Sequence, residues 1–208
     1  MLNYTLVACI SLMVVLYSYK YSNGYDILNH QDYCPTNYSN ESFATQCQYV
    51  DKKEAAQIMS KLNGIAGQLS RYLEGQHGLD GDKIQCLMAR NLSSRYGGTP
   101  SLRETHPHNK DGDTSYTIDK GSVLSLCLRT GSGDLHDFET LKFVFLHELT
   151  HIAANVYQHP DKFWKMFKVL LHEAEQAGLY SPIDYSRYPV KYCGKLDISY
   201  NPYYDVSI

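Results

Sequence analysis

The stretch FVFLHELTHIAANVYQHPDKFW, residues 143–164, carries two histidines four positions apart, with a glutamate directly after the first. Apolar residues recur around them at helical spacing. This pattern predicts a helix on which His147 and His151 lie one turn apart on the same face. Two imidazoles at this spacing can both reach one Zn²⁺ ion at about 2.0–2.1 Å. The stretch therefore predicts a metal site on a largely apolar helix.

Glu148 directly follows the first of these histidines, so its carboxylate is expected beside the metal position and not on it. In an H-E-x-x-H sequence, a carboxylate at this point acts as the general base toward a water that the metal activates. We therefore predict Glu148 as the catalytic residue of a hydrolase. The fourth metal position stays open for the substrate.

A catalytic zinc site of this type needs a third protein ligand. His159 is the predicted one, because it directly precedes Pro160, a residue suited to the first turn of a helix. An apolar stripe from Phe163 to Ala174 predicts that helix, and Gly178 marks its end. A histidine at its start could fold back to the metal. The alternative ligands, further along the same helix, are His172, Glu173 and Glu175.

The sequence before this region predicts two more helices and a hairpin. Apolar residues at helical spacing indicate an amphipathic helix from about Asp51 to Gly75, and a shorter helix is expected over 83–95. The run TSYTIDKGSVLSLCLR, residues 114–129, contains two β-prone segments joined by a turn around Gly121. The expected fold is of the α+β class. We also expect the strand 123–128 to offer an edge along which a peptide could lie.

The segments 116–129 and 143–164 together resemble the WLM family of metallopeptidases, the Wss-type relatives of the SprT proteases. In that family a segment of the type N-x-G-x-x-I-x-L-x-L-R precedes H-E-L-x-H, and a third histidine followed by an aromatic residue completes the site. The resemblance covers residues 114–172. It implies an α+β, zincin-like metallopeptidase domain in which a small β-sheet or hairpin packs on the H-E-x-x-H helix. It also implies a Zn²⁺ cofactor and a peptide or protein substrate. The residues it implies for the site are His147, His151 and His159 as zinc ligands and Glu148 as general base.

The N-terminus contains an uncharged apolar stretch from Tyr4 to Tyr19. In helical form it would span roughly 24 Å, close to the ~30 Å of a bilayer core. It lacks a basic n-region and a clear small-residue exit, so an uncleaved anchor is favoured over a signal peptide. We predict a single-pass membrane protein with an anchor at 1–20, a polar linker at 21–50 and the metallopeptidase domain at 51–208. The side of the membrane stays open.

Charge and composition bear on other functions. The net charge of −3 and the lack of a Lys/Arg cluster argue against nucleic-acid binding.

The closing segment, residues 182–202, is similar to proteins of large DNA viruses, which suggests a viral source. Two alternatives to an enzyme remain, an inactive zinc-binding protein and a structural membrane or virion protein. The intact Glu148 favours the enzyme.

Two features of the chain leave alternatives open. Six cysteines occur without a C-x-x-C pair, so a Cys34–Cys47 disulfide and reduced thiols are both compatible with the sequence. A donor that helps the metal stabilise negative charge on the substrate could come from the C-terminal segment, although packing or surface roles are the simpler expectation. The candidate donors are Arg187, Tyr188 and Tyr192.

Overall fold

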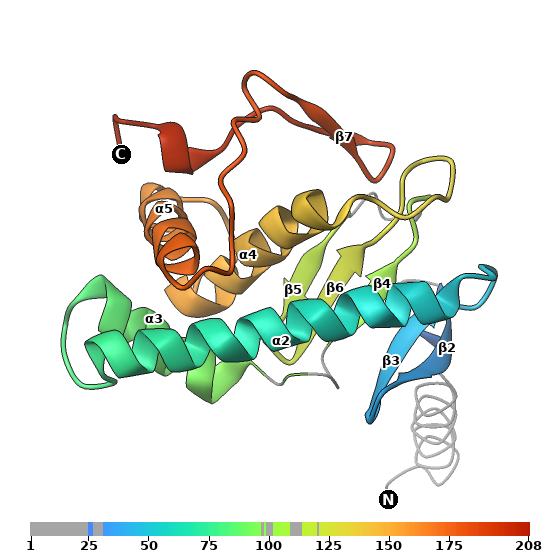
Figure 1. Ribbon diagram of the computed structural model, residues 1–208, viewed down its shortest axis with the longest axis horizontal. Coiled ribbons are helices and arrows are strands. Elements are labelled where there is room, and N and C mark those ends of the chain that lie inside the picture. Colours follow the sequence, from blue (N-terminus) through green and yellow to red (C-terminus); the bar gives the residue numbers. More distant parts are fainter. Residues whose placement is uncertain (1–24, 27–30, 97, 99–101, 109–113, 120) are drawn as a thin grey trace, which may run out of the picture.

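The computed structural model describes residues 25–26, 31–96, 98, 102–108, 114–119 and 121–208 (Figure 1). In this part of the chain, helices and a mixed sheet confirm the predicted α+β class. The helical elements are α2 (Lys52–His77), α3 (Ile84–Arg95), α4 (Phe138–Ala154), α5 (Asp161–Gln176) and the 3₁₀ turn η2 (Pro202–Tyr204). The strands are β1 (Tyr25–Asp26), β2 (Gln31–Tyr38), β3 (Glu41–Gln46), β4 (Leu102–Thr105), β5 (Tyr116–Ile118), β6 (Val123–Cys127), β7 (Val190–Tyr192) and β8 (Leu196–Ile198).

The main sheet has the order β1-β2-β3-β4-β6-β5, and β7 and β8 form a separate hairpin. Strands β3, β4 and β6 run parallel, whereas β5 pairs antiparallel with β6. The hairpin predicted for residues 114–129 is thus confirmed. The prediction that its second strand offers an edge is wrong, because β6 lies between β4 and β5 and all five of its residues are buried. Strand β5 forms one edge of this sheet, and β1 forms the other.

The structure corrects the linker prediction over residues 31–46, which form the β2–β3 hairpin of the sheet. Polar composition suggested a linker, but several residues of these strands are buried. Tyr33 and Phe43 are buried, and Cys34 is joined to Cys47 by a disulfide. The folded domain therefore begins before residue 51.

The predicted membrane anchor, residues 1–20, lies outside the described residues. Within the described ranges, no helix combines the length and apolar character needed to cross a membrane.

Helix α4 lies at the centre of the packing. It contacts α3 and α5 as well as β5 and β6, while the long α2 covers β2, β3 and β4 (Figure 1). The start of α4 is fixed by its N-cap residue Asp137, whose carboxylate accepts a hydrogen bond from the Thr140 backbone N–H at 2.9 Å. Thr150, inside the motif, donates its hydroxyl to the Leu146 carbonyl at 2.8 Å and is fully buried. The motif is thus carried by a helix that the core holds on nearly every side.

Candidate functional site

Three imidazoles converge where α4 meets the start of α5. His147 and His151 come from α4, and the Nε2 atom of His159 lies 2.8 Å from the Nε2 atom of His147. One ligand nitrogen from each of the three rings lies within 4.8 Å of the other two. Phe163, fully buried at the start of α5, packs against all three rings. The structure therefore brings together the three histidines that the sequence singled out.

The return of the chain from α4 to His159 depends on a left-handed turn at Asn155, which has φ 57° and ψ 46°. Asparagine adopts this conformation more readily than most residues. The turn is held from α3, where Asn91 donates to the Ala153 carbonyl at 2.7 Å and Arg95 donates to the Asn155 side chain at 3.0 Å. The eight-residue spacing between His151 and His159 is thus bridged by a fixed turn.

The chemistry of this donor set fits a zinc ion. In a tetrahedral zinc site with Zn–N distances of about 2.05 Å, two ligand nitrogens lie about 3.3 Å apart. The three histidine nitrogens therefore need to shift by only about 1 Å to share one ion. His151 Nδ1 lies 3.1 Å from the Val156 carbonyl. Donation of the Nδ1 proton to that oxygen leaves Nε2 as the lone-pair nitrogen, as is usual for a metal-binding histidine.

Burial keeps these rings in the neutral form that binds metals. Burial lowers the pKa of His147 to about 3, and the imidazoles of His151 and His159 add to this effect. Burial also lowers the pKa of His151 to about 4, with a further contribution from His159. Burial also lowers the pKa of His159. At neutral pH the cluster thus presents lone pairs and not positive charges.

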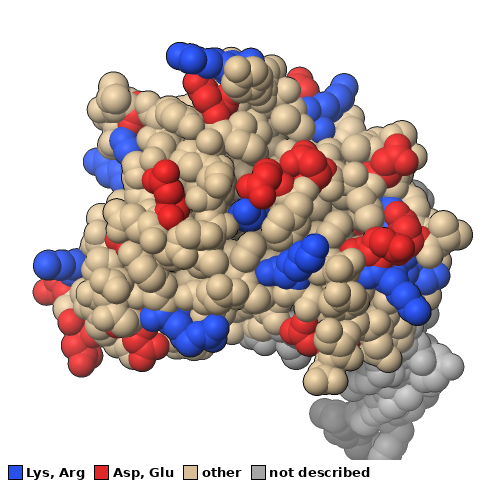
Figure 2. All heavy atoms as spheres, in the orientation of Figure 1, with Lys and Arg blue, Asp and Glu red and all other residues tan. Residues whose placement is uncertain are grey.

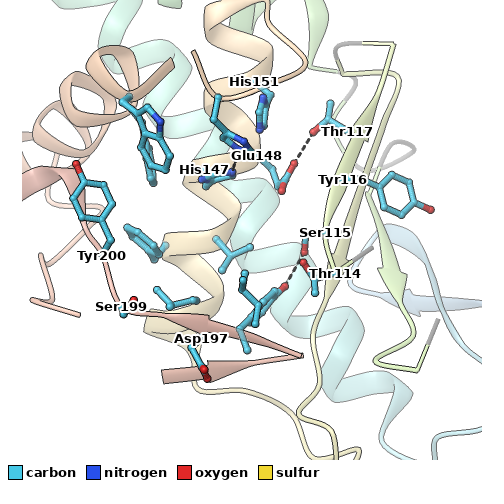
Figure 3. A pocket seen from close by; sticks show the side chains of 18 of the residues that line it. Thr114, Ser115, Tyr116, Thr117, His147, Glu148, His151, Asp197, Ser199 and Tyr200 are labelled. Atoms are coloured by element: carbon cyan, nitrogen blue, oxygen red, sulfur yellow. Dashed lines mark hydrogen bonds between the residues drawn. The ribbon is translucent and has the colours of Figure 1, made fainter. Parts of the chain in front are cut away.

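Glu148 is buried directly beside the histidines, and its Oε2 atom accepts a hydrogen bond of 3.0 Å from the Thr117 hydroxyl on the edge strand β5 (Figure 3). Burial raises the pKa of this carboxyl to about 7, and the Thr117 hydroxyl opposes part of that rise. A carboxyl with this pKa can both accept and release a proton near neutral pH. Sequence reasoning did not find Thr117, because its role depends on how β5 lies against α4.

A cleft of about 440 Å³ opens over the histidines and Glu148 (Figure 3). The edge strand β5 bounds one side, and the start of α5 with Tyr200 bounds the opposite side. The β7–β8 hairpin closes a third side, where Ser199 and Asp197 are seen (Figure 3). The size is within the range of about 300–1,000 Å³ common for ligand sites. The cleft is therefore large enough for part of an extended peptide.

The β7–β8 hairpin is fixed to the sheet next to this cleft. A disulfide joins Cys193, just after β7, to Cys127 at the end of β6. The hydroxyl groups of Tyr192 and Ser115 lie 2.7 Å apart, and the Tyr192 ring stacks on His136 at 5.1 Å. The sequence left disulfides and free thiols open. The described part of the chain contains two disulfides, the Cys34–Cys47 pair that the sequence suggested and the Cys127–Cys193 pair that it did not. Among the described residues, Cys86 is a free thiol.

Replacing Cys127 and Cys193 together by serine is expected to lower the free energy of unfolding by about 2–4 kcal/mol. The disulfide closes a long loop, with a sequence separation of 66. The hairpin that bounds the cleft also loses its covalent link, so the backbone amides of residues 190–198 should exchange their hydrogens faster. Urea unfolding and amide hydrogen exchange check the two effects. Removal of the Cys34–Cys47 disulfide is the matched control, because it should lower stability and leave exchange in the hairpin slow. Equally fast exchange in the hairpin after removal of either disulfide would contradict the role given to the Cys127–Cys193 link.

The alternative third ligands lie elsewhere. Glu173 pairs with His77 of α2 at 3.0 Å, Glu175 accepts a hydrogen bond of 2.6 Å from Tyr203, and His172 packs against the same tyrosine ring at 4.2 Å. These contacts place all three on other faces of α5.

The three candidate donors of the C-terminal segment differ in whether they lie at the cleft. Tyr192 is buried and lines the cleft. Burial raises the pKa of its phenol, so the hydroxyl keeps its proton. Tyr188 is 69% exposed, and Arg187 pairs with Asp184 at 3.1 Å on the surface. Of these three, only Tyr192 is among the described residues that line the cleft.

The fold and the site define an α+β protein in which three histidines and a buried glutamate share one cleft. A family model, the WLM domain, matches residues 83–186, and the chain belongs to this family. The matched segment runs from the start of α3 to beyond α5. It therefore contains every histidine of the cluster as well as Glu148.

Relatives include viral proteins and a yeast enzyme. The chain is 29% identical over 187 residues to uncharacterized protein R325 of Acanthamoeba polyphaga mimivirus, a match that covers 89% of this chain and 91% of that protein. It is 36% identical over 74 residues to uncharacterized protein 136R of invertebrate iridescent virus 6, covering 34% of this chain and 41% of that protein. It is 34% identical over 94 residues to DNA-dependent metalloprotease WSS1 homolog 2 of Schizosaccharomyces pombe, covering 42% of this chain and 32% of that protein. No solved structure gives a significant match.

Proposed function

We propose that this protein is a zinc-dependent metallopeptidase with a zincin-like domain, in which His147, His151 and His159 bind the metal and Glu148 is the general base. The observation that carries the proposal is the convergence of three imidazoles from two chain segments beside a buried carboxylate in an open cleft. Family membership supports it, since one relative is a metalloprotease by name.

The chain's own groups divide the work of peptide hydrolysis. When bound, zinc would polarise the scissile carbonyl and acidify the attacking water. The Thr117 hydroxyl holds Glu148 through Oε2. The other carboxylate oxygen, Oε1, can then take a proton from the attacking water and pass it to the leaving amine. Phe163 excludes solvent from behind the three rings.

The substrate is proposed to be a peptide segment in extended conformation. Strand β5 is the edge of the main sheet and carries Thr117, so a peptide aligned along this edge would pass Glu148. Backbone hydrogen bonds to an edge strand bind such segments independently of their sequence. An unfolded protein or a flexible loop meets this requirement, whereas a segment within a folded core does not.

The yeast relative is DNA-dependent by name, but the charge of this chain gives no support for the same dependence. The net charge is −3. On the face shown in Figure 2, Lys and Arg side chains are interspersed with Asp and Glu and form no continuous basic surface. We therefore propose a peptide or protein substrate without a nucleic-acid partner.

The His159→Ala variant tests the metal site. The unaltered chain should carry about one zinc per molecule, and the variant should lose most of it together with hydrolysis, because two imidazoles hold a catalytic zinc poorly. His159 lies toward the exposed side of the cluster, so the fold should persist. Elemental analysis and circular dichroism check this.

His172→Ala is the matched control, because His172 lies in α5, the helix that follows His159, but packs against Tyr203 outside the cluster. It should keep both zinc and hydrolysis. If His159→Ala binds zinc as tightly as the unaltered chain, the assignment of the third ligand fails. If the unaltered chain binds no zinc, the proposed function fails.

A further inference from the structure

The part of the cleft next to Glu148 has an apolar lining. From α4 it is formed by Phe143 and Val144, and from the hairpin by Leu196 and Ile198, with Tyr192 at its base. Of these five, Leu196 is half exposed at 50%, and each of the others is less than 10% exposed. We call these five residues the apolar lobe of the cleft.

The position of the apolar lobe follows from helix geometry. Phe143 and Val144 lie four residues before His147 and Glu148, so they share the same face of α4, one turn away. One turn is about 5.4 Å along the axis. In an extended peptide, successive residues advance by about 3.3 Å and their side chains alternate in direction. A side chain flanking the scissile bond therefore reaches the apolar lobe when the bond itself lies beside Glu148.

The outer wall of the apolar lobe is preformed. Leu196 and Ile198 lie two residues apart in β8, so their side chains point to the same face of the hairpin. Asp197 lies between them, and its carboxylate points away from the histidines (Figure 3). The Cys127–Cys193 disulfide and a hydrogen bond of 3.0 Å from the Cys193 backbone N–H to His136 fix the hairpin.

The charge of the residues that line the cleft also affects which substrate side chains it can accept. Two carboxylates, those of Glu148 and Asp197, belong to residues that line it, and none of the described lining residues is Lys or Arg. An acidic substrate side chain would thus enter an apolar lobe and find no cation among the described residues that line the cleft. Burial of an unpaired charge in such surroundings is unfavourable.

We propose that the apolar lobe is the specificity subsite of this protein. It takes a large apolar side chain, aromatic or branched aliphatic, from the residue flanking the scissile bond, and it rejects acidic side chains. The inference rests on the proposed function for the meaning of the scissile bond. The family match ends at residue 186, so the hairpin residues 190–198 that build the wall lie outside it.

The test uses the full chain and fluorescence-quenched peptides that share one flexible frame and differ at a single central position, which is Phe, Leu, Gly or Asp. The value of kcat/KM is expected to be about 10-fold or more higher for Phe and Leu than for Gly and Asp. The Leu196→Lys variant should reduce the ratio of Phe to Asp by about 10-fold or more, because it places a cation on the wall. Leu196 is half exposed, so the fold should tolerate the change.

Tyr188→Lys is the matched control, since Tyr188 precedes the same hairpin but lies outside the cleft lining. It should leave the Phe to Asp ratio unchanged. Equal kcat/KM for all four peptides, or an unchanged ratio in Leu196→Lys, would overturn the specificity subsite.

A binding arm separates this inference from the proposed function. Anisotropy titrations of the same peptides onto the Glu148→Gln variant should show tighter binding for Phe and Leu than for Asp. If the Glu148→Gln variant prefers Phe and Leu peptides but the unaltered chain hydrolyses none of them, the specificity subsite stands and the proposed peptidase function fails. If the unaltered chain hydrolyses the peptides but neither hydrolysis nor binding shows a preference, the peptidase function stands and the specificity subsite fails.

Discussion

The Glu148→Gln variant is expected to keep its zinc and to lose hydrolysis of an unfolded protein substrate by a factor on the order of 10² to 10⁴, the usual contribution of a general base. Glutamine has nearly the shape of glutamate, and its carbonyl oxygen can still accept the Thr117 hydroxyl that now bonds Oε2 at 3.0 Å. It cannot take a proton from the attacking water. The substitution thus removes one chemical step and leaves the geometry.

Glu139→Gln is the matched control, because this second carboxylate of α4 is 42% exposed and pairs with Lys142 at 2.9 Å, away from the residues that line the cleft. Zinc content by elemental analysis and peptide hydrolysis should both remain near those of the unaltered chain. Two outcomes would contradict the assignment of Glu148. One is hydrolysis by Glu148→Gln within a few-fold of the unaltered chain. The other is a loss of zinc, which would make Glu148 a ligand.

The part of the site that depends on local spacing could be predicted from the sequence. An i, i+4 pair of histidines shares a face of any helix, so the meeting of His147 and His151 needs only that the segment be helical. The prediction of His159 depended on a turn whose geometry the sequence does not specify. That turn exists because Asn155 adopts a left-handed conformation and α3 donates hydrogen bonds to the end of α4.

The rest of the site could not be predicted, because it depends on contacts between distant segments. Thr117 reaches Glu148 only because β5 forms the edge of the sheet over α4. The pairing of Cys127 with Cys193 spans 66 residues and has no local sequence pattern. The same limit explains the linker error at 31–46. Tyr, Asn, Ser and Gln are compatible with exposed loops, and nothing local in this segment specifies that β3 pairs with β4, a strand more than 50 residues further along the chain.

Arg129 shows how strongly such non-local contacts hold the sheet. Its guanidinium is 1% exposed and donates to Glu104 Oε1 at 2.7 Å and to Asp51 Oδ2 at 3.0 Å. Its Nη2 atom also forms an ion pair with Asp51 Oδ1 at 2.9 Å. Its Nη1 atom also donates to the Gly133 carbonyl at 2.9 Å, and the ring of Tyr49 lies 3.7 Å from the guanidinium carbon. Glu104, fully buried in β4, further accepts the Gln46 backbone N–H of β3 at 2.8 Å. One side chain thus connects β4, the start of α2 and the loop before α4.

The Arg129→Met variant is therefore expected to lose about 3–5 kcal/mol of unfolding free energy, because it leaves the carboxylate of Glu104 buried without its counter-charge. The double variant Arg129→Met with Glu104→Gln should recover part of that loss, since an amide is far less costly to bury than an unpaired charge. Urea unfolding measures both. Arg187→Met, which breaks the exposed pair with Asp184, should leave the free energy of unfolding nearly unchanged. A loss below about 1 kcal/mol in Arg129→Met, or a double variant less stable than the single one, would show that the buried charges do not depend on each other as proposed.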